Sequence, residues 1–285
     1  VPDARPISAC TCSRKGLMMR LPSFLALAAL LVFVGTSCSR LTFVKPASKR
    51  IAYEEKGSAY SVSDSAATKQ RLATQDRLAL ASQRLQSGDL ASAEREATAV
   101  LKINPGSADA NTILAIVQDQ KGNSERAGGY YKRAAELAPT QGAALNNYGA
   151  WLCGNGHEAE SLLWFDRAVE APGYNSPASA YANAGGCALK VGQYERAQRD
   201  LLKAIALEPT NAYALASMAE SEFRQGRYFE ARAFSERRLA AAPANAAVLQ
   251  LAVRIEDKLG DTVAASRYSQ RLRAEFPEAV SANPG

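Results

Sequence analysis

The stretch GQYERAQRDLLKAIALEP, Gly192 to Pro209, begins with a glycine, has an alanine five residues later and ends in a proline. Glycines recur along the chain at intervals of 34, 34, 36, 34 and 34 residues, at Gly88, Gly122, Gly156, Gly192, Gly226 and Gly260. Prolines follow five of these glycines by 17 residues, at Pro105, Pro139, Pro209, Pro243 and Pro277. A fixed period of this length indicates an array of structural repeats.

Small residues keep the same period. One set lies five residues after the glycines and comprises Ala93, Ala127, Ser161, Ala197, Ala231 and Ala265; a second comprises Ala81, Ala115, Gly149, Gly185 and Ala219. A glycine that ends one helix, a proline that ends the next and small residues where the two helices cross predict a helix–turn–helix unit. With a period of 34 residues this is the tetratricopeptide pattern. We therefore expect an all-α fold, a right-handed superhelix of six tetratricopeptide repeats.

In this register the six repeats span residues 74–107, 108–141, 142–177, 178–211, 212–245 and 246–279, followed by a tail, 280–285. The third repeat has two extra residues in EAPGYNSP, which ends at Pro177, so we expect a longer turn before the fourth. The last repeat has Val253 at the small position and a polar second helix, ASRYSQRLRAEF, in which Arg267, Gln270, Arg271 and Arg273 can face water. Such a helix is typical of a terminal cap.

We expect residues 1–37 to comprise an upstream segment and a signal sequence. Met19, the expected start of translation, and Arg20 form a short positive region before an uncharged apolar run of 14 residues, Leu21 to Val34. This run is shorter than the ~20 residues needed to span a bilayer, but it is typical of a signal peptide.

The sequence FVGTSCS, which contains Cys38, resembles the lipobox of bacterial lipoproteins, although Gly35 stands where Leu, Val or Ile is usual. The resemblance implies a covalent lipid on Cys38, and Ser39 suits sorting to the outer membrane. The alternative is cleavage at the same bond by an ordinary signal peptidase. Residues 38–73 have no sustained period and predict a flexible tether.

Charge and composition argue against several functions. The net charge of +6 falls to +3 without residues 1–37, which contain four basic residues and one acidic residue, and no basic cluster with interleaved aromatics remains. The one histidine, His157, follows a turn glycine, and no clustered ligands suggest a metal site. No base is suggested for a serine or cysteine nucleophile. We expect no enzymatic activity, nucleic acid, small-molecule substrate or cofactor other than the lipid.

Cys153 and Cys187 lie in the first helices of the third and fourth repeats, at the twelfth and tenth positions. These helices pack side by side in a repeat stack. A disulfide between them would link the two repeats if the Cα atoms lie within about 7 Å. The alternative is two buried thiols that act as small apolar residues. The cysteine spacing leaves both open.

The first helices of stacked repeats line a concave face, and we expect a partner to bind there. Positions two, five, six, nine and twelve predict the groove residues Leu78, Ser82, Leu85, Thr112, Ile116, Asp119, Asn146, Asn147, Ala150, Asn183, Gly186 and Leu189. Basic residues that clamp a carboxylate tail are missing from this set. An apolar groove with asparagines suits an extended or helical peptide. Alternatively, the asparagines are solvated or cap helices.

The chain resembles the PilF/PilW family of type IV pilus biogenesis lipoproteins. The resemblance rests on the lipoprotein signal, the six repeats, LNNYGAWLC (145–153), YANAGGCAL (181–189) and the ending RIEDKLGDTVAASRYSQRLRAEFP (254–277). It implies a periplasmic adaptor, or pilotin, anchored in the outer membrane. Such an adaptor helps the pilus secretin subunit to reach that membrane and multimerise. The alternative is a general periplasmic scaffold for cell-wall hydrolases or outer-membrane protein assembly.

Overall fold

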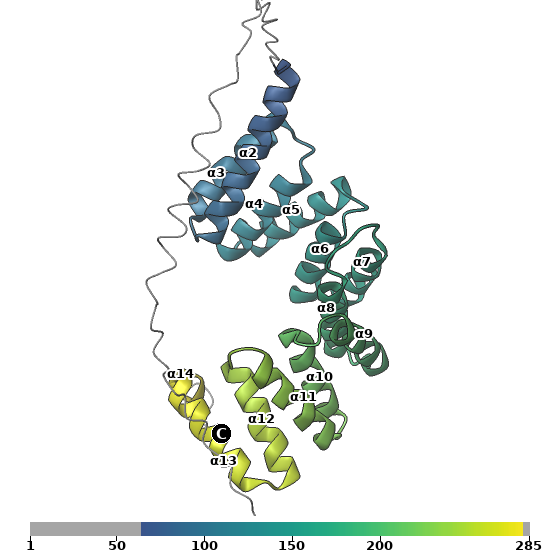
Figure 1. The fold of residues 1–285 in the computed structure, drawn as a ribbon, viewed down its shortest axis with the longest axis vertical. Helices are drawn as coiled ribbons and strands as arrows, with labels where there is room; N and C mark the ends of the chain where they lie inside the picture. The colour runs from purple at the N-terminus through teal and green to yellow at the C-terminus, as the bar shows by residue number, and fades with distance from the viewer. Residues whose placement is uncertain (1–63, 282–285) are drawn as a thin grey trace, which may run out of the picture. The chain divides into compact units, whose positions relative to one another are not determined.

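The computed structural model describes residues 64–281, and within this range the chain folds entirely into helices, with no strand (Figure 1). The helices are α2 (Ala66–Gln86), α3 (Leu90–Ile103), α4 (Ala108–Gln120), α5 (Ser124–Leu137), α6 (Gly142–Gly154), α7 (Glu158–Glu170), α8 (Pro177–Lys190), α9 (Tyr194–Leu207), α10 (Ala212–Arg224), α11 (Tyr228–Ala241), α12 (Ala246–Leu259), α13 (Thr262–Glu275) and α14 (Pro277–Ser281). The predicted signal sequence, Cys38 and most of the tether lie outside the described residues.

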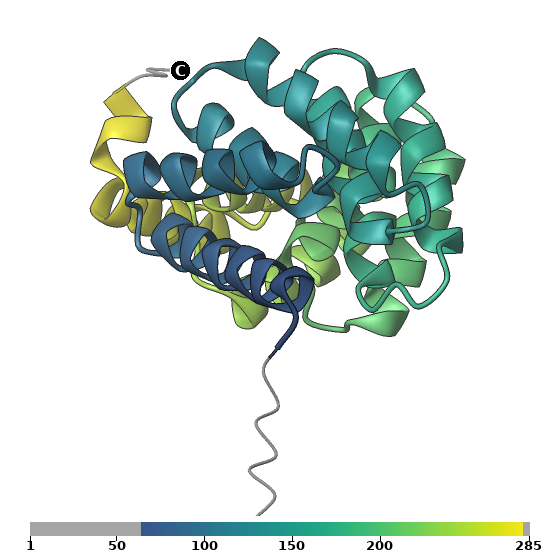
Figure 2. The same cartoon turned by 90° about the horizontal axis from the view of Figure 1, so that it is seen from above.

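The helices form six consecutive pairs, α2/α3 to α12/α13. The first helices of repeats two, three, five and six begin at the predicted residues, and α8 begins one residue earlier, at Pro177. The predicted all-α fold of tetratricopeptide repeats is therefore confirmed. In Figure 1 the colour passes in chain order from blue α2 to yellow α13, because each pair lies against the next. Figure 2 shows the same ribbon from above, with the first and last pairs overlapping in the view.

The turn inside every pair has the same backbone geometry. All six predicted turn glycines have a positive φ, between 72° and 84°. In each turn the residue after the glycine donates its backbone N–H to the carbonyl five residues earlier, as His157 does to Leu152 at 2.9 Å. This is the hydrogen bond of a glycine-ended helix. The glycines recur in the sequence because each repeat contains one such turn between its two helices.

The small positions let the two helices of a pair approach closely. A Cβ added at Gly149 would lie 2.8 Å from Cε1 of Phe165, and one added at Gly185 would lie 2.5 Å from Cγ of Leu201. In both pairs the side chain that fills the space beside the glycine belongs to the second helix. It lies four residues after the small residue of that helix, Ser161 or Ala197. These side chains belong to the core, since Phe165 and Leu201 are almost completely buried.

Neighbouring pairs pack mainly through the second helix of one repeat and the first helix of the next, as α3 does against α4 and α7 against α8. Along the described chain the first helices also contact one another, from α2 and α4 to α10 and α12, whereas successive second helices make few or no such contacts. The first helices therefore form the inner side of the stack. Figure 1 shows α7 and α9 lying outside α6 and α8.

Helix α2 begins at Ala66, so the prediction of a tether up to residue 73 is wrong for residues 66–73. Ser65 caps the helix, because its side chain accepts a hydrogen bond from the backbone N–H of Thr68 at 3.1 Å. Most side chains in these two turns are exposed. Polar helix-forming residues and a good N-cap extend the helix beyond the region that the repeat pattern can identify.

The two extra residues of the third repeat lengthen the turn before α8, as predicted. They also cover the start of α6, because a Cβ added at Gly142 would lie 2.4 Å from Cγ of Tyr174. Gly173 has a φ of 71°, which turns the chain so that Tyr174 can reach this position. The insertion thus adds a packing contact inside its own repeat.

The last pair has the predicted exposed surface. Arg267, Gln270, Arg271 and Arg273 of α13 are exposed, while Tyr268 packs against α12 residues in the core. Among the described residues, no helix is long and apolar enough to cross a membrane.

Replacement of Gly185 by alanine tests the close helix crossing. The new methyl group would overlap Leu201, which costs about 1–3 kcal/mol and outweighs the gain of up to ~1 kcal/mol in helix propensity. Gly129 provides the matched control, because it lies inside α5 and a Cβ there meets no atom within 4 Å. We expect Gly185→Ala to lower the melting temperature and Gly129→Ala to raise it. Equal shifts would contradict the account.

Candidate partner-binding groove

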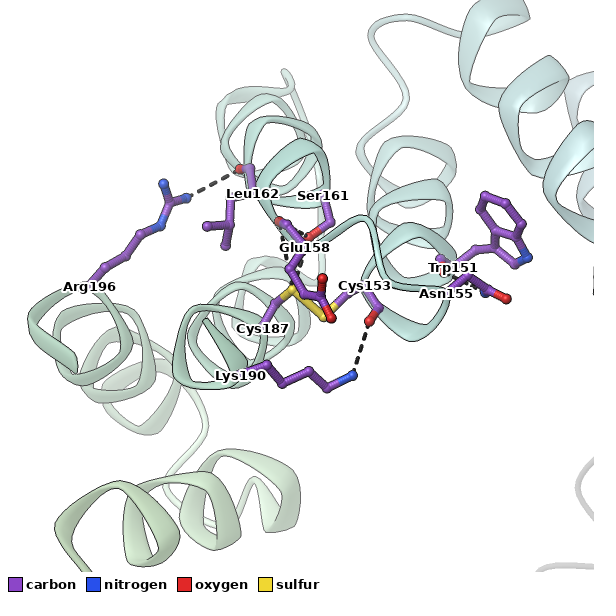
Figure 3. Close-up of a disulfide and its surroundings, with 9 residues drawn as sticks. All are labelled: Trp151, Cys153, Asn155, Glu158, Ser161, Leu162, Cys187, Lys190 and Arg196. Atoms are coloured by element: carbon purple, nitrogen blue, oxygen red, sulfur yellow. Dashed lines mark hydrogen bonds between the residues drawn. A yellow bond between two sulfur atoms is a disulfide. The ribbon is translucent and has the colours of Figure 1, made fainter. Parts of the chain in front are cut away.

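A disulfide joins the first helices of the third and fourth repeats. Cys153 of α6 and Cys187 of α8 are bonded, with 5.9 Å between their Cα atoms, which lies in the usual range for disulfides (Figure 3). Both are buried. They occupy the twelfth and tenth positions of first helices that contact each other in the stack. Of the two alternatives that the sequence left open, the structure has the disulfide.

Hydrogen bonds surround the disulfide on both sides. The Oγ atom of Ser161 lies 3.0 Å from Sγ of Cys187 and donates to the carbonyl of Glu158 at 2.7 Å. Among the six small residues that follow the turn glycines by five positions, Ser161 is the one serine and the others are alanines. On the other side, Nζ of Lys190 donates to the carbonyl of Cys153 at 3.0 Å (Figure 3). The junction of α6 and α8 is thus fixed by covalent and polar contacts together.

Two of the predicted groove asparagines contact each other. Nδ2 of Asn183 donates to Oδ1 of Asn146 at 3.1 Å, and Asn146 is only 8% exposed. The prediction that Asn146 lies open to a partner is therefore wrong, because its side chain is used to connect α6 to α8. Neither residue caps a helix, since both lie inside their helices.

Asn147 lies in an open pocket between the second and third repeats. The pocket has a volume of about 410 Å³ and is lined by Asp119, Ser124, Tyr131, Asn147, Ala150, Trp151, Gly154 and Asn155. Asp119, Asn147 and Ala150 were predicted as groove residues, and the structure brings them together. The other lining residues come from α5, from the end of α6 and from the turn after α6. They were not predicted, because the prediction used only the inward-facing positions of first helices.

Tyr131 is the most buried aromatic side chain of this pocket. It is 9% exposed and occupies the same repeat position as Phe165 and Leu201. Burial, together with the nearby carboxylate of Asp119, raises the pKa of the Tyr131 hydroxyl to about 12. The hydroxyl is therefore uncharged at neutral pH. The recurrence of large side chains at this position could have identified Tyr131 as a core residue with a polar end.

Trp151 forms the opposite wall of the pocket and is also a packing residue. Its Nε1 atom donates to the carbonyl of Ser124 at 3.0 Å, and its ring fills the space above Gly128, where an added Cβ would lie 2.2 Å from the indole. Figure 3 shows Trp151 pointing away from the disulfide. Helix α6 therefore carries the disulfide on one side and the pocket on another.

Two further predicted groove residues do not line open space. Leu189 is 5% exposed and belongs to the core cluster that also contains Met218. Gly186 is covered by Tyr213, whose Oη atom would lie 2.3 Å from an added Cβ. These predictions are wrong because α10 of the fifth repeat packs over both residues. Tyr213 is 50% exposed and is therefore an accessible residue of this region. The predicted groove residues do not include it, because they end with the fourth repeat.

The remaining predicted residues divide into core and surface. Leu78, Leu85 and Ile116 are half-buried and pack against core clusters. Ser82 and Thr112 are half-buried, and Thr112 donates its hydroxyl to the carbonyl of Ala108 at 3.1 Å. The inner surface is therefore a row of apolar and neutral polar side chains.

No group of three or more His, Cys, Asp or Glu side chains that could hold a metal ion occurs within residues 64–281. His157 is exposed at the turn after α6, with its ring 6.4 Å from that of Trp151.

The known proteins that this chain is similar to also contain tetratricopeptide repeats. Residues 78–142 and 178–211 match the tetratricopeptide-repeat family. The crystal structure of PilW, described as a widely conserved type IV pilus biogenesis factor, aligns with a TM-score of 0.69 at 26% identity, over 74% of this chain and 98% of PilW. This chain is built of tetratricopeptide repeats and is similar to PilW in sequence and fold.

Two other solved structures share the fold of this chain. Pseudomonas aeruginosa PilF aligns with a TM-score of 0.67 at 23% identity, over 74% of this chain and 95% of PilF. A tetratricopeptide repeat protein from Parabacteroides merdae aligns with a TM-score of 0.57 at 17% identity, over 72% and 80% of the two chains. A search of curated proteins finds no match.

Reduction of the disulfide tests its contribution to the repeat stack. The bond closes a loop of 34 residues, for which the expected stabilisation is about 3–4 kcal/mol. We expect a reductant to lower the melting temperature of the wild-type protein. The double variant Cys153→Ala/Cys187→Ala should melt at the reduced temperature whether or not reductant is present. A wild-type protein that melts at the same temperature in both states would contradict this prediction.

Proposed function

We propose that this chain is a pilotin, a lipoprotein adaptor that binds the type IV pilus secretin through the inner surface of its repeats and promotes localisation and multimerisation of the secretin in the outer membrane. The observation that carries the proposal is the alignment with PilW, which extends over 98% of that protein. PilW is described as a type IV pilus biogenesis factor, and the shared fold is a repeat scaffold rather than a catalytic domain.

The inner surface suits an extended segment of a partner protein. Tetratricopeptide stacks bind partners along the surface formed by successive first helices. Here that surface offers the amide of Asn147 and the hydroxyls of Ser82 and Thr112 between apolar side chains. Such neutral groups can hydrogen-bond a peptide backbone, while the apolar positions receive its side chains.

The disulfide and the asparagine pair keep this surface in one arrangement. Both contacts join α6 to α8, the two first helices at the middle of the stack. A rigid surface loses little conformational entropy when a partner binds, so more of the contact energy appears as affinity. The two contacts therefore support a preformed binding surface.

The proposed anchor is a diacylglycerol group on Cys38. The 27 residues between Cys38 and Ala66 can span at most about 100 Å when fully extended. This reach allows the repeats to contact a secretin subunit on the periplasmic side while the lipid remains in the outer membrane.

Deletion of the gene in its native host tests the proposed function. We expect loss of the heat-stable secretin multimers and of twitching motility, and recovery of both when the wild-type gene is restored. The amount of secretin monomer serves as the control, because a pilotin affects assembly rather than synthesis. Unchanged multimers with normal twitching would contradict the proposal. Copurification of cell-wall hydrolases or outer-membrane assembly factors in place of the secretin would favour the scaffold alternative.

A further inference from the structure

The pocket beside Asn147 contains a carboxylate and a hydroxyl that have no partner among the described residues. Asp119 lies in the last turn of α4 and is exposed, and no salt bridge or side-chain hydrogen bond involves its carboxylate. Tyr131 lines the pocket and is more than nine-tenths buried, and its hydroxyl has no hydrogen-bond partner in the described chain. Both groups are available to a ligand.

The electrostatics of this pocket favour a cation. No lysine or arginine lines it. Lys121, two residues after Asp119, pairs with Glu94, and Lys190 of α8 donates to the carbonyl of Cys153. On α5, Arg126 and Arg133 line a different pocket with Asn111 and Tyr130, and Lys132 is exposed and does not line this one. The pocket is also lined by residues in the last turns of α4 and α6, where the helix dipole carries partial negative charge, against one helix start, that of α5 at Ser124.

The walls of the pocket suit a long side chain. Its volume of about 410 Å³ lies within the range of ordinary ligand sites. Asn147 provides an amide, whereas the amide of Asn155 already accepts from the hydroxyl of Ser124 and donates to the carbonyl of Trp151. Trp151 provides an aromatic surface, against which the apolar stem or the planar group of a basic side chain can pack. The hydroxyl of Tyr131 is uncharged and can accept a hydrogen bond from the ligand.

We propose that this pocket, the Asp119 pocket, binds an arginine or lysine side chain from the partner segment that lies along the inner surface. The proposal rests on the proposed function and adds one requirement to it, a basic residue in the bound segment. The Asp119 carboxylate forms the ion pair, and Tyr131 and Asn147 accept the remaining N–H groups. The partner is thereby positioned over the second and third repeats.

Charge reversal at Asp119 tests the proposal. Asp257 provides the matched control, because it occupies the same repeat position at the end of α12 and is also exposed. Lysine near the C-terminus of either helix is compatible with the helix dipole, so both variants should fold. We expect Asp119→Lys to weaken capture of the type IV pilus secretin by about tenfold or more, while Asp257→Lys binds it as the wild-type protein does. Circular dichroism melting checks that both variants are folded.

The outcomes separate this proposal from the proposed function. Secretin capture that is equal for Asp119→Lys and wild type would overturn the Asp119 pocket and leave the pilotin function standing. Failure of the wild-type protein to capture secretin would contradict the pilotin function, and the pocket is then decided by a second measurement.

That measurement is an NMR titration of the ¹⁵N-labelled protein with N-acetyl-arginine amide, with N-acetyl-citrulline amide as the uncharged control. We expect the arginine compound alone to shift the indole signal of Trp151 and the side-chain amide signals of Asn147. Asp119→Asn should weaken this binding by roughly three- to tenfold. Equal shifts from citrulline, or no shift from arginine, would overturn the proposal.

Discussion

The hydrogen bond that closes each glycine turn is the constraint on which the rest of the structure depends. It joins the N–H of the residue after the glycine to a carbonyl five residues earlier, and it recurs in all six pairs. The turn fixes where the second helix begins, and so brings small residues to the point where the helices cross. Because each pair leaves the turn in the same way, equal positions of successive first helices meet along the inner side. The same stacking brings Cys153 and Cys187 together, although they stand at the twelfth and tenth positions of their helices.

The third and fourth repeats add specific contacts to this general pattern. The disulfide, the pair of Asn146 and Asn183, and the bond from Lys190 to Cys153 all join α6 to α8. The inserted turn with Tyr174 packs against the start of α6. These contacts cluster at the middle of the stack, beside the pocket that contains Asn147. Rigidity is thus concentrated where the proposed partner would bind.

Much of the fold could be predicted from the sequence, because glycine, proline and small residues have backbone and steric roles that depend on local position. The start of α2 could not be predicted, since residues 66–73 are exposed and belong to no repeat. The candidate site was predicted less completely. Position in a helix shows which way Asn146 or Gly186 points, but not that Asn183 or Tyr213 from another repeat already occupies that space. Pocket residues from second helices, such as Tyr131, were missed for the same reason.

The central claim is that a partner binds the inner surface formed by the first helices. Site-specific photo-crosslinking in native membranes tests it most directly, with p-benzoylphenylalanine placed at Ala150, which is exposed in the Asp119 pocket, or at Leu163, which is 63% exposed on α7. The account predicts that the secretin is crosslinked from position 150 and not from position 163. Crosslinking of the secretin from position 163 alone would contradict it.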